Sequence, residues 1–378
     1  MIALALDSLF LATLLLLFAL QQQEFLVAGS VLCALYAFFR KGLLPVDFDH
    51  LLLVLVAGLL LFAPVLRLDH GFGPAFYLFS MLSVYYAAKR FSESSLNHVQ
   101  LCLRIVFWLS FFGILFGVAN YWDSAEPMGE IFLGTSTNGL PSYFIVLQAA
   151  LSVSVFLDRN RLPIMSPIAT FIVAVLGLGR GSIIVALLIF LFSLFVNYFV
   201  IDRNKFGRHS RFALGFVVLS LVFFVGGTLY IDGAFDELIE GSKFGAGVLD
   251  EHRGYMVNDY LGKIEFWSFL FGTDYTGTSI ISSYGGNPHN SFIRLHSFYG
   301  VWGLLLVLLS MIFILMANRR TVTKIVTFCL LLFVLIRAVT EPILFPTLLD
   351  FFYFLCLFVF VRHAPVSVAR RRTMCLKQ

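Results

Sequence analysis

Apolar runs separated by short polar segments follow one another along most of the chain. A helix needs about 20 apolar residues to cross a bilayer, and most of the runs come close to this length. Lipid offers no hydrogen-bond partners to the backbone, so spanning segments must be helical. The pattern predicts an all-α fold, a polytopic transmembrane bundle of about twelve helices that forms a single integral membrane domain over residues 1–378. The runs are 2–20, 25–39, 51–66, 72–88, 101–119, 139–157, 163–179, 181–201, 213–231, 296–317, 325–340 and 343–361.

The composition supports this prediction. The 378 residues are 60% hydrophobic and 13% charged, with a mean hydropathy of +0.91. A soluble domain carries about 25% charged residues, so the chain has too little polar surface to fold in water. The start of the chain lacks the basic residues of a cleaved signal peptide, which favours a retained first helix. Neither the cysteines nor any nucleotide or metal motif indicates a disulfide framework or a cofactor.

Lysine and arginine predict the orientation. Eighteen of the 26 lie in alternate loops and in the C-terminal tail, whereas seven lie on the other side or at its membrane edges. Basic loops stay in the cytoplasm. Both termini are therefore expected in the cytoplasm.

A long polar segment, 232–295, interrupts the pattern between the ninth and tenth predicted helices and should lie outside the cytoplasm. Its acids outnumber its bases by nine to four, so an anionic substrate would have to be held there by specific arginines. Apolar residues follow one another at intervals of three and four, as on one face of an amphipathic helix, and Gly272 would end that helix. These residues are Val257, Tyr260, Ile264, Trp267 and Phe271.

Four charged residues on the outer side are candidates for chemistry. Arg180 begins a helix, whose free N–H groups favour phosphate, although a membrane-edge arginine also snorkels to head groups. Arg253 starts the amphipathic helix, and taken alone it is better explained as a solvated charge paired with Glu251 or Asp250. His289 could be a general base, a phosphate ligand or an ordinary loop histidine. Glu341 is expected to pair with Arg337.

The arrangement of these residues resembles the O-antigen polymerase and ligase family. The resemblance rests on Arg180-Gly181 at an outer edge, on Arg253 ahead of an aromatic-rich helix, on Pro288-His289-Asn290-Ser291-Phe292, and on Gly300 and Gly303 downstream. It covers about 180–304. Gly179 stands where a serine is expected before the Arg-Gly pair.

The resemblance implies a metal-independent glycosyltransferase of the bacterial inner membrane whose active face is periplasmic. The donor would be an oligosaccharide on undecaprenyl pyrophosphate. The acceptor would be a hydroxyl of another lipid-linked repeat unit in a polymerase, or of the lipopolysaccharide core in a ligase. Membrane lipids and a chain-length regulator protein are the other expected partners, and nucleic acid is not one.

Polymerase is the preferred activity because the chain is compact. A flippase or transporter of lipid-linked oligosaccharide is disfavoured, because the apolar runs are nearly free of charge. Arg180, Arg253 and His289 are expected to be catalytic. Four further residues are expected to bind substrate, namely Arg294, Asn290, Tyr255 and His252.

Overall fold

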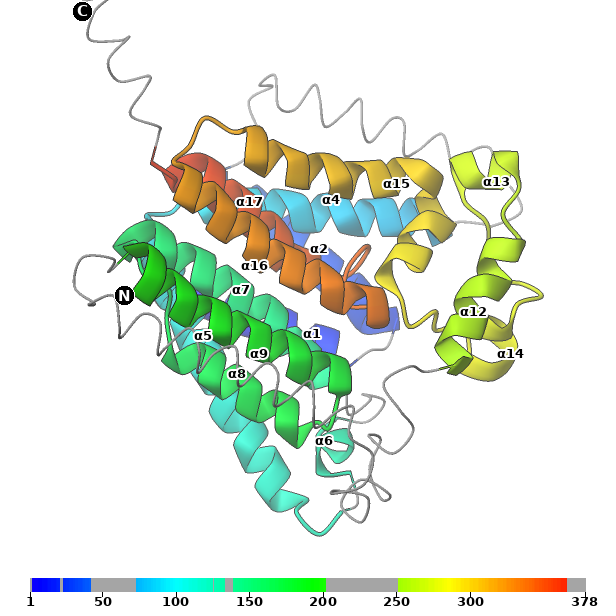
Figure 1. Ribbon diagram of the computed structural model, residues 1–378, viewed down its shortest axis with the longest axis horizontal. Coiled ribbons are helices and arrows are strands. Elements are labelled where there is room, and N and C mark those ends of the chain that lie inside the picture. The colour runs from blue at the N-terminus through cyan, green and yellow to red at the C-terminus, as the bar shows by residue number, and fades with distance from the viewer. Residues whose placement is uncertain are drawn as a thin grey trace, which may run out of the picture.

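The computed structural model describes residues 2–20, 23–41, 73–124, 126–132, 139–201 and 251–365. Within these ranges every regular element is a helix (Figure 1). Two predicted runs, 51–66 and 213–231, lie outside the described residues. So does the first part of the polar segment, 232–250. Each of the other ten runs is helical over most of its length. The helices of the bundle are α1 (Ile2–Ala19), α2 (Gln23–Lys41), α4 (Gly73–Ser92), α5 (Leu96–Asn120), α7 (Gly139–Arg159), α8 (Met165–Leu176), α9 (Arg180–Phe195) with the π-helix η2 (Val196–Ile201), α15 (Ser291–Met316), α16 (Thr321–Thr340) and α17 (Asp350–His363).

Seven helices of this part of the chain are long and apolar enough to cross a membrane. The all-α fold is confirmed for the described residues, and the count of about twelve crossings stays a prediction. The seven are α1, α2, α5, α7, α9 with η2, α15 and α16.

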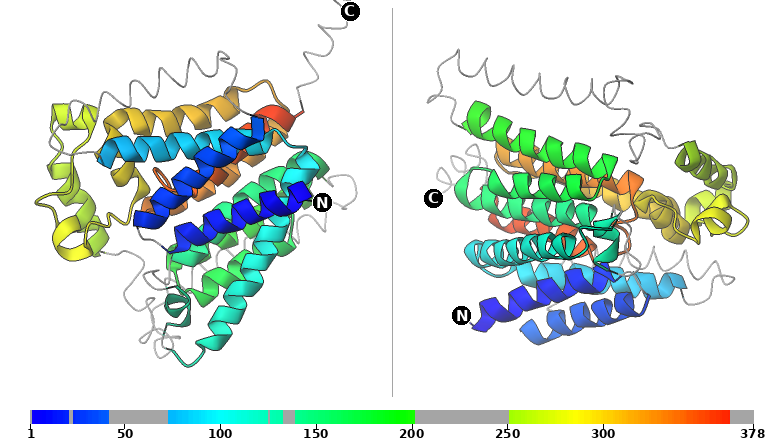
Figure 2. Two further views of the ribbon diagram at one scale, coloured as in Figure 1. Left: turned by 180° about the vertical axis from the view of Figure 1, so that it is seen from behind. Right: turned by 90° about the horizontal axis from the view of Figure 1, so that it is seen from below.

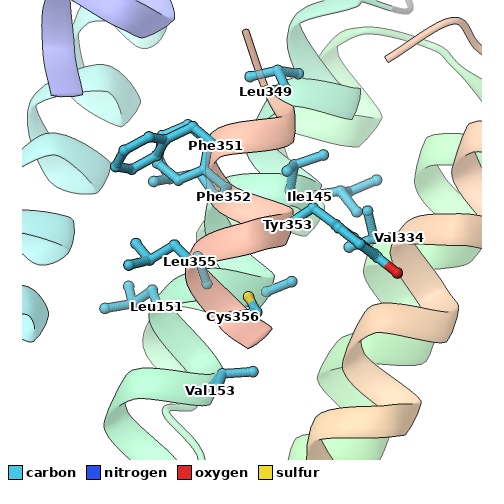
Figure 3. Packing of buried hydrophobic residues seen from close by; sticks show 14 of the residues in the cluster. Ile145, Leu151, Val153, Val334, Leu349, Phe351, Phe352, Tyr353, Leu355 and Cys356 are labelled. Carbon is cyan, nitrogen blue, oxygen red and sulfur yellow. The ribbon is translucent and has the colours of Figure 1, made fainter. Parts of the chain in front are cut away.

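Helix α7 forms the centre of the bundle, and all its residues from Gly139 to Leu157 are buried. It contacts α5, α8, α16 and α17. Figure 3 shows α17 packed beside α7, with Phe351 and Leu355 on one side of α17 and Tyr353 on the other. Many outward-facing side chains on the peripheral helices are large and apolar, such as Leu109 and Phe116 of α5. Such a surface suits lipid rather than water.

The helix ends gather at two opposite ends of the bundle (Figures 1 and 2). At one end, which we call the basic end, Arg40 donates to Ser94 Oγ at 2.6 Å and His98 lies 2.7 Å from Asp7. Arg319 there donates to the carbonyl oxygen of Ala364 at 2.6 Å. The other end, which we call the loop end, carries the short helices α6 (Pro127–Glu130), α12 (Glu251–Gly262), α13 (Phe266–Phe271) and α14 (Ser279–Tyr284).

The amphipathic helix expected from Arg253 to Phe271 is instead two helices, α12 and α13, so that prediction was wrong in its length. Helix α12 ends at Gly262. Glu265 then caps α13 through a reciprocal pair of hydrogen bonds with Ser268, which starts a new helix direction. Tyr260 is therefore 1% exposed, whereas Trp267 is 69% exposed. Gly272, with a φ of 87°, ends α13 as predicted.

The last predicted run, 343–361, is helical only from Asp350 onward. Residues 341–349 form a non-helical segment that is almost entirely buried, and we call it the buried loop. The Asp350 carboxylate accepts hydrogen bonds from the N–H groups of Phe345 and Thr347, both at 2.8 Å. These bonds stabilise a non-helical backbone. In a membrane such backbone is tolerated only inside protein or beside a cavity.

Candidate functional site

The Arg180-Gly181-Ser182 motif forms the first turn of α9 at the loop end. Gly179 is extended and caps the helix. A Cβ atom on Gly181 would lie 3.2 Å from Arg337 Nη1 and 3.3 Å from Thr340 Oγ1. Glycine therefore lets the guanidinium of α16 approach the backbone of α9. Arg180 itself is half-buried, and its Nη1 has no hydrogen-bond partner among the described residues.

Arg337 joins three helices beside this motif. It is 2% exposed. Its Nε donates to Ser142 Oγ of α7 at 3.0 Å and to Ser182 Oγ of α9 at 2.9 Å. Its Nη2 lies 3.3 Å from Glu341 Oε1, so the predicted ion pair is confirmed. A buried charge is tolerated when it is paired and its donors are satisfied, and here both conditions are met.

The Asn-Pro-His-Asn segment leads into α15 at the same end. His289 has a φ of 44°, and its N–H donates to Asn287 Oδ1 at 3.0 Å. Asn290 Oδ1 accepts from the N–H groups of Phe292 at 2.8 Å and Ile293 at 3.2 Å. Asn290 is thus the N-cap of α15, a position at which asparagine is strongly preferred.

Two side chains of the first turn of α15 hold the buried loop. Ser291 Oγ donates to the carbonyl oxygen of Glu341 at 2.8 Å and accepts from the N–H of Leu344 at 3.0 Å. Arg294 Nη2 donates to the carbonyl oxygens of Pro342 and, at 2.9 Å, Leu344. The closing motif of the polar segment and the loop before α17 are therefore one unit.

A cavity of about 470 Å³ lies among these elements; we call it the polar cavity. Arg294 and Glu341 supply its charges, and Gln23, Asn287 and Thr347 supply neutral polar groups. The Nε of Arg294 is buried and has no hydrogen-bond partner in the part of the chain that the structure describes. Five aromatic side chains complete the polar and aromatic lining, namely Phe18, Tyr77, Tyr143, Tyr275 and Phe298.

The short helices of the loop end are tied to one another by polar contacts. Lys263 Nζ lies 2.7 Å from Asp274 Oδ1. Burial opposes ionisation of Asp274, but the hydrogen bonds from Lys263 and Thr276 outweigh it and lower the pKa of Asp274. The N–H of Ser279 donates to Asp259 Oδ2 at 2.6 Å and lowers the pKa of Asp259. Burial raises the pKa of Tyr275 to about 12, so its hydroxyl is neutral at physiological pH.

Helix α13 is seated on a bend in α15 through backbone contacts. Gly300 has a φ of 59° and a ψ of −152°, which interrupts the helical geometry of α15. A Cβ atom there would lie 2.1 Å from the carbonyl oxygen of Leu270. A Cβ atom on Gly272, at the end of α13, would lie 2.4 Å from the carbonyl oxygen of His296. Only glycine permits such a close approach at positive φ.

The structure places the predicted site residues unequally. Arg294 lines the polar cavity, Asn290 caps the helix that carries Arg294, and His289 lies between Asn290 and the lining residue Pro288. Neither Arg180 nor His289 is among the described residues that line this cavity, although Arg180 adjoins the residues that contact Arg337. The side chains of His252 and Arg253 lie outside the described part of the structure, at the start of α12.

Tyr255 is the one predicted substrate-binding residue whose side chain is seen on α12, and it is 68% exposed. It is not one of the described residues that line the polar cavity. An exposed tyrosine at this level suits an interfacial contact with lipid or sugar.

Sequence reasoning did not find the residues that connect the parts of the site. Ser142 and Ser182 belong to apolar runs, and nothing in the local pattern relates them to Arg337. The tyrosines of the polar cavity come from α4, α7 and the segment after α13, so no sequence spacing links them. The Arg337–Glu341 pair was predictable because Glu341 is only four residues beyond Arg337, directly after the last turn of α16.

Three potential metal ligands meet at the opposite end of the bundle. The ligand atoms of Asp7, His98 and Cys102 lie within 4.8 Å of one another. Asp7 already accepts hydrogen bonds from Tyr36 at 2.9 Å and Arg40 at 2.5 Å. These contacts make the group a polar network around the buried Asp7 that fastens α1 to α2 and α5.

No protein-family model matches the chain, and neither a curated protein nor a solved structure shows detectable similarity to it.

Proposed function

We propose that the protein is a membrane glycosyltransferase of the bacterial inner membrane that polymerises lipid-linked glycan repeat units. The observation that carries the proposal is the polar cavity, which combines an arginine whose Nε is buried, a carboxylate, amides and tyrosines at one end of an apolar helical bundle. Sugars bind through aromatic faces and hydrogen-bonding groups. Guanidinium groups suit the pyrophosphate of the donor.

The loop end is assigned to the periplasm in this proposal. The basic residues Arg40, Arg90 and Arg319 lie at the other end, in agreement with cytoplasmic basic loops. The polar cavity then opens where undecaprenyl-pyrophosphate-linked glycans are used. Both termini would be cytoplasmic.

The proposed reaction is a substitution at the anomeric carbon of the donor glycan. An acceptor hydroxyl forms the new glycosidic bond to that carbon, and the bond from carbon to pyrophosphate oxygen breaks. The leaving undecaprenyl pyrophosphate takes the electron pair, and Arg294 stabilises the developing charge together with Arg180 and Arg253. His289 is the proposed recipient of the hydroxyl proton.

Gene deletion followed by analysis of surface polysaccharide tests the proposal. The expected outcome is loss of long chains while single repeat units remain attached to the lipopolysaccharide core. Loss of all attachment, with lipid-linked polymer accumulating, would identify a ligase instead. An unchanged polysaccharide profile would contradict both activities.

The decisive complementation uses Arg294→Ala beside Arg319→Ala. Both arginines donate to backbone carbonyl oxygens, but Arg319 does so at the basic end. Restoration of long chains by the Arg319→Ala variant alone is expected. Equal restoration of long chains by both variants would show that Arg294 has no role in the proposed reaction.

A further inference from the structure

A second cavity adjoins the polar cavity in the same half of the bundle. It measures about 320 Å³ and is bounded by α1, α5, α7 and the Ile131-Phe132 segment. Its lining is almost wholly apolar, and we call it the apolar groove. On α1 it is lined between Ala12 and Ala19, the half of that helix nearer the loop end.

The two cavities share one side chain and meet at one pair of rings. Tyr143 lines both the polar cavity and the apolar groove. Phe18, which lines the polar cavity, packs edge to face against Tyr143 with ring centroids 4.7 Å apart. Phe18 and Tyr143 therefore form the boundary between a charged compartment and an apolar one.

The apolar groove faces the lipid. Leu16 of α1 and Leu109 of α5 both line it, and they are 48% and 65% exposed. Gly113 of α5 also lines the groove and leaves open space, because no atom lies within 4 Å of a Cβ placed there. Along α7 the groove extends from Leu140 to Leu147, a rise of about 10 Å.

We infer that the apolar groove receives the phosphate-proximal isoprene units of the lipid carrier. This inference rests on the proposed function, which places a pyrophosphate at Arg294 in the polar cavity. A pyrophosphate joined to a long apolar chain needs a charged compartment that opens directly into an apolar one. The boundary at Phe18 and Tyr143 provides that junction, and the remainder of the chain passes between Leu16 and Leu109 into the bilayer.

The test uses the full-length protein in lipid nanodiscs and a probe that needs no catalysis. The probe is undecaprenyl monophosphate with a photoreactive diazirine in the isoprene unit next to the phosphate. Mass spectrometry should locate its crosslinks on peptides that contain Leu16, Leu109 or Leu140. Gly113→Phe fills the groove, and crosslinking there should fall about tenfold, as expected when a few methylene groups lose their burial.

Matched variants keep the result interpretable. Gly113→Ala adds one methyl group to open space and should crosslink like the unmodified protein, as should Leu308→Phe on the lipid face of α15. Should Gly113→Phe fail to fold, Leu109→Trp at the mouth of the groove takes its place. Crosslinks elsewhere in the bundle, or equal crosslinking in Gly113→Ala and Gly113→Phe, would overturn the inference.

A parallel assay of glycan transfer separates the two proposals. Labelled groove peptides in a protein that transfers no glycan would overturn the proposed function and leave the lipid site standing. Transfer of glycan by a protein whose groove is never labelled would overturn the lipid site and leave the proposed function standing.

Discussion

Arg337 on α16 donates from Nε to Ser182 Oγ on α9 at 2.9 Å, although the two residues are 155 positions apart in the sequence. The same N–H also contacts Ser142 Oγ of α7 at 3.0 Å. One guanidinium thus fixes the relative positions of three helices at the loop end. The predicted outer-edge motif at Arg180 is attached to the polar cavity through Arg337 and Glu341.

The shared N–H predicts a non-additive pair of substitutions. Either Ser142→Ala or Ser182→Ala leaves one acceptor for Arg337 Nε and should change the free energy of unfolding by less than about 1 kcal/mol. The double variant leaves a buried charged donor unsatisfied and should cost about 2–3 kcal/mol. Thermal unfolding in detergent measures the difference.

Ser193→Ala is the matched control for this cycle. Ser193 is also buried on α9, but its hydroxyl donates to Ile189 of its own helix. Strict additivity of the two serine substitutions would show that Arg337 does not link the helices.

Asp350→Asn should open the buried loop without unfolding the bundle. The carboxylate accepts from two N–H groups, and an asparagine of the same shape offers only one acceptor oxygen. The expected cost is about 1–3 kcal/mol. Amide hydrogen exchange of 341–349 should accelerate, whereas exchange in α7 should not. Unchanged exchange in this loop would contradict the assignment, and Asp158→Asn, beside Arg159 at the basic end, provides the control.

Arg294 should be required for transfer in a way that lysine does not restore. Its guanidinium donates to two carbonyl oxygens and leaves Nε without a partner among the described residues, whereas an ammonium cannot make this planar set of contacts. Loss of one preorganised donor costs on the order of 100-fold in rate. Transfer assayed in proteoliposomes should fall by that factor in Arg294→Lys and stay near normal in Arg319→Lys. A fully active Arg294→Lys protein would limit the residue to a structural role.

The Lys263–Asp274 pair should make the loop end sensitive to acid. The pKa of Asp274 is lowered in the folded state, so its ionised form stabilises the fold. This stabilisation is present above the ordinary pKa of about 3.9 and is lost as pH falls through the pKa of the folded state. Both side chains are about one-third exposed, so the effect is a fraction of 1 kcal/mol.

Limited proteolysis of the segment between α12 and α14 should show this transition. Cleavage should increase below about pH 4, and Asp274→Asn should be cleaved readily at every pH. Asp123→Asn, near α6, should retain the acid transition. A pH-independent rate in the unmodified protein would argue against the pair.

Gly300→Ala should release α13 from α15. The new Cβ would meet the carbonyl oxygen of Leu270 at 2.1 Å, a distance that no rotamer can relieve. Gly277→Ala is a stringent control, because Gly277 also has a positive φ, 76°, but has no neighbour within 4 Å of a Cβ. Hydrogen exchange of α13 should rise in the first variant only, and a rise of equal size in both would attribute the effect to backbone strain.

The fold class could be predicted because burial in lipid requires long apolar helices, and α1, α5 and α9 follow that rule. Hydropathy could not separate the buried loop from α17, because both segments are apolar. An apolar segment has the same hydropathy whether it is helical or is a loop held by Asp350. The predicted 253–271 helix was wrong because the cap at Glu265 is set by a side-chain contact with Ser268. The Arg337–Glu341 pair was predictable, whereas its serine partners depend on tertiary packing.

The seating of α13 on α15 has a consequence for how such a protein can diversify. Main-chain atoms approach closely at Gly272 and Gly300, whereas the side chains of Phe266 and Trp267 are each 69% exposed. Substitutions of Phe266 or Trp267 leave the backbone contact between α13 and α15 unchanged. The outer face of α13 can therefore change in sequence while the packing of α13 on α15 is preserved.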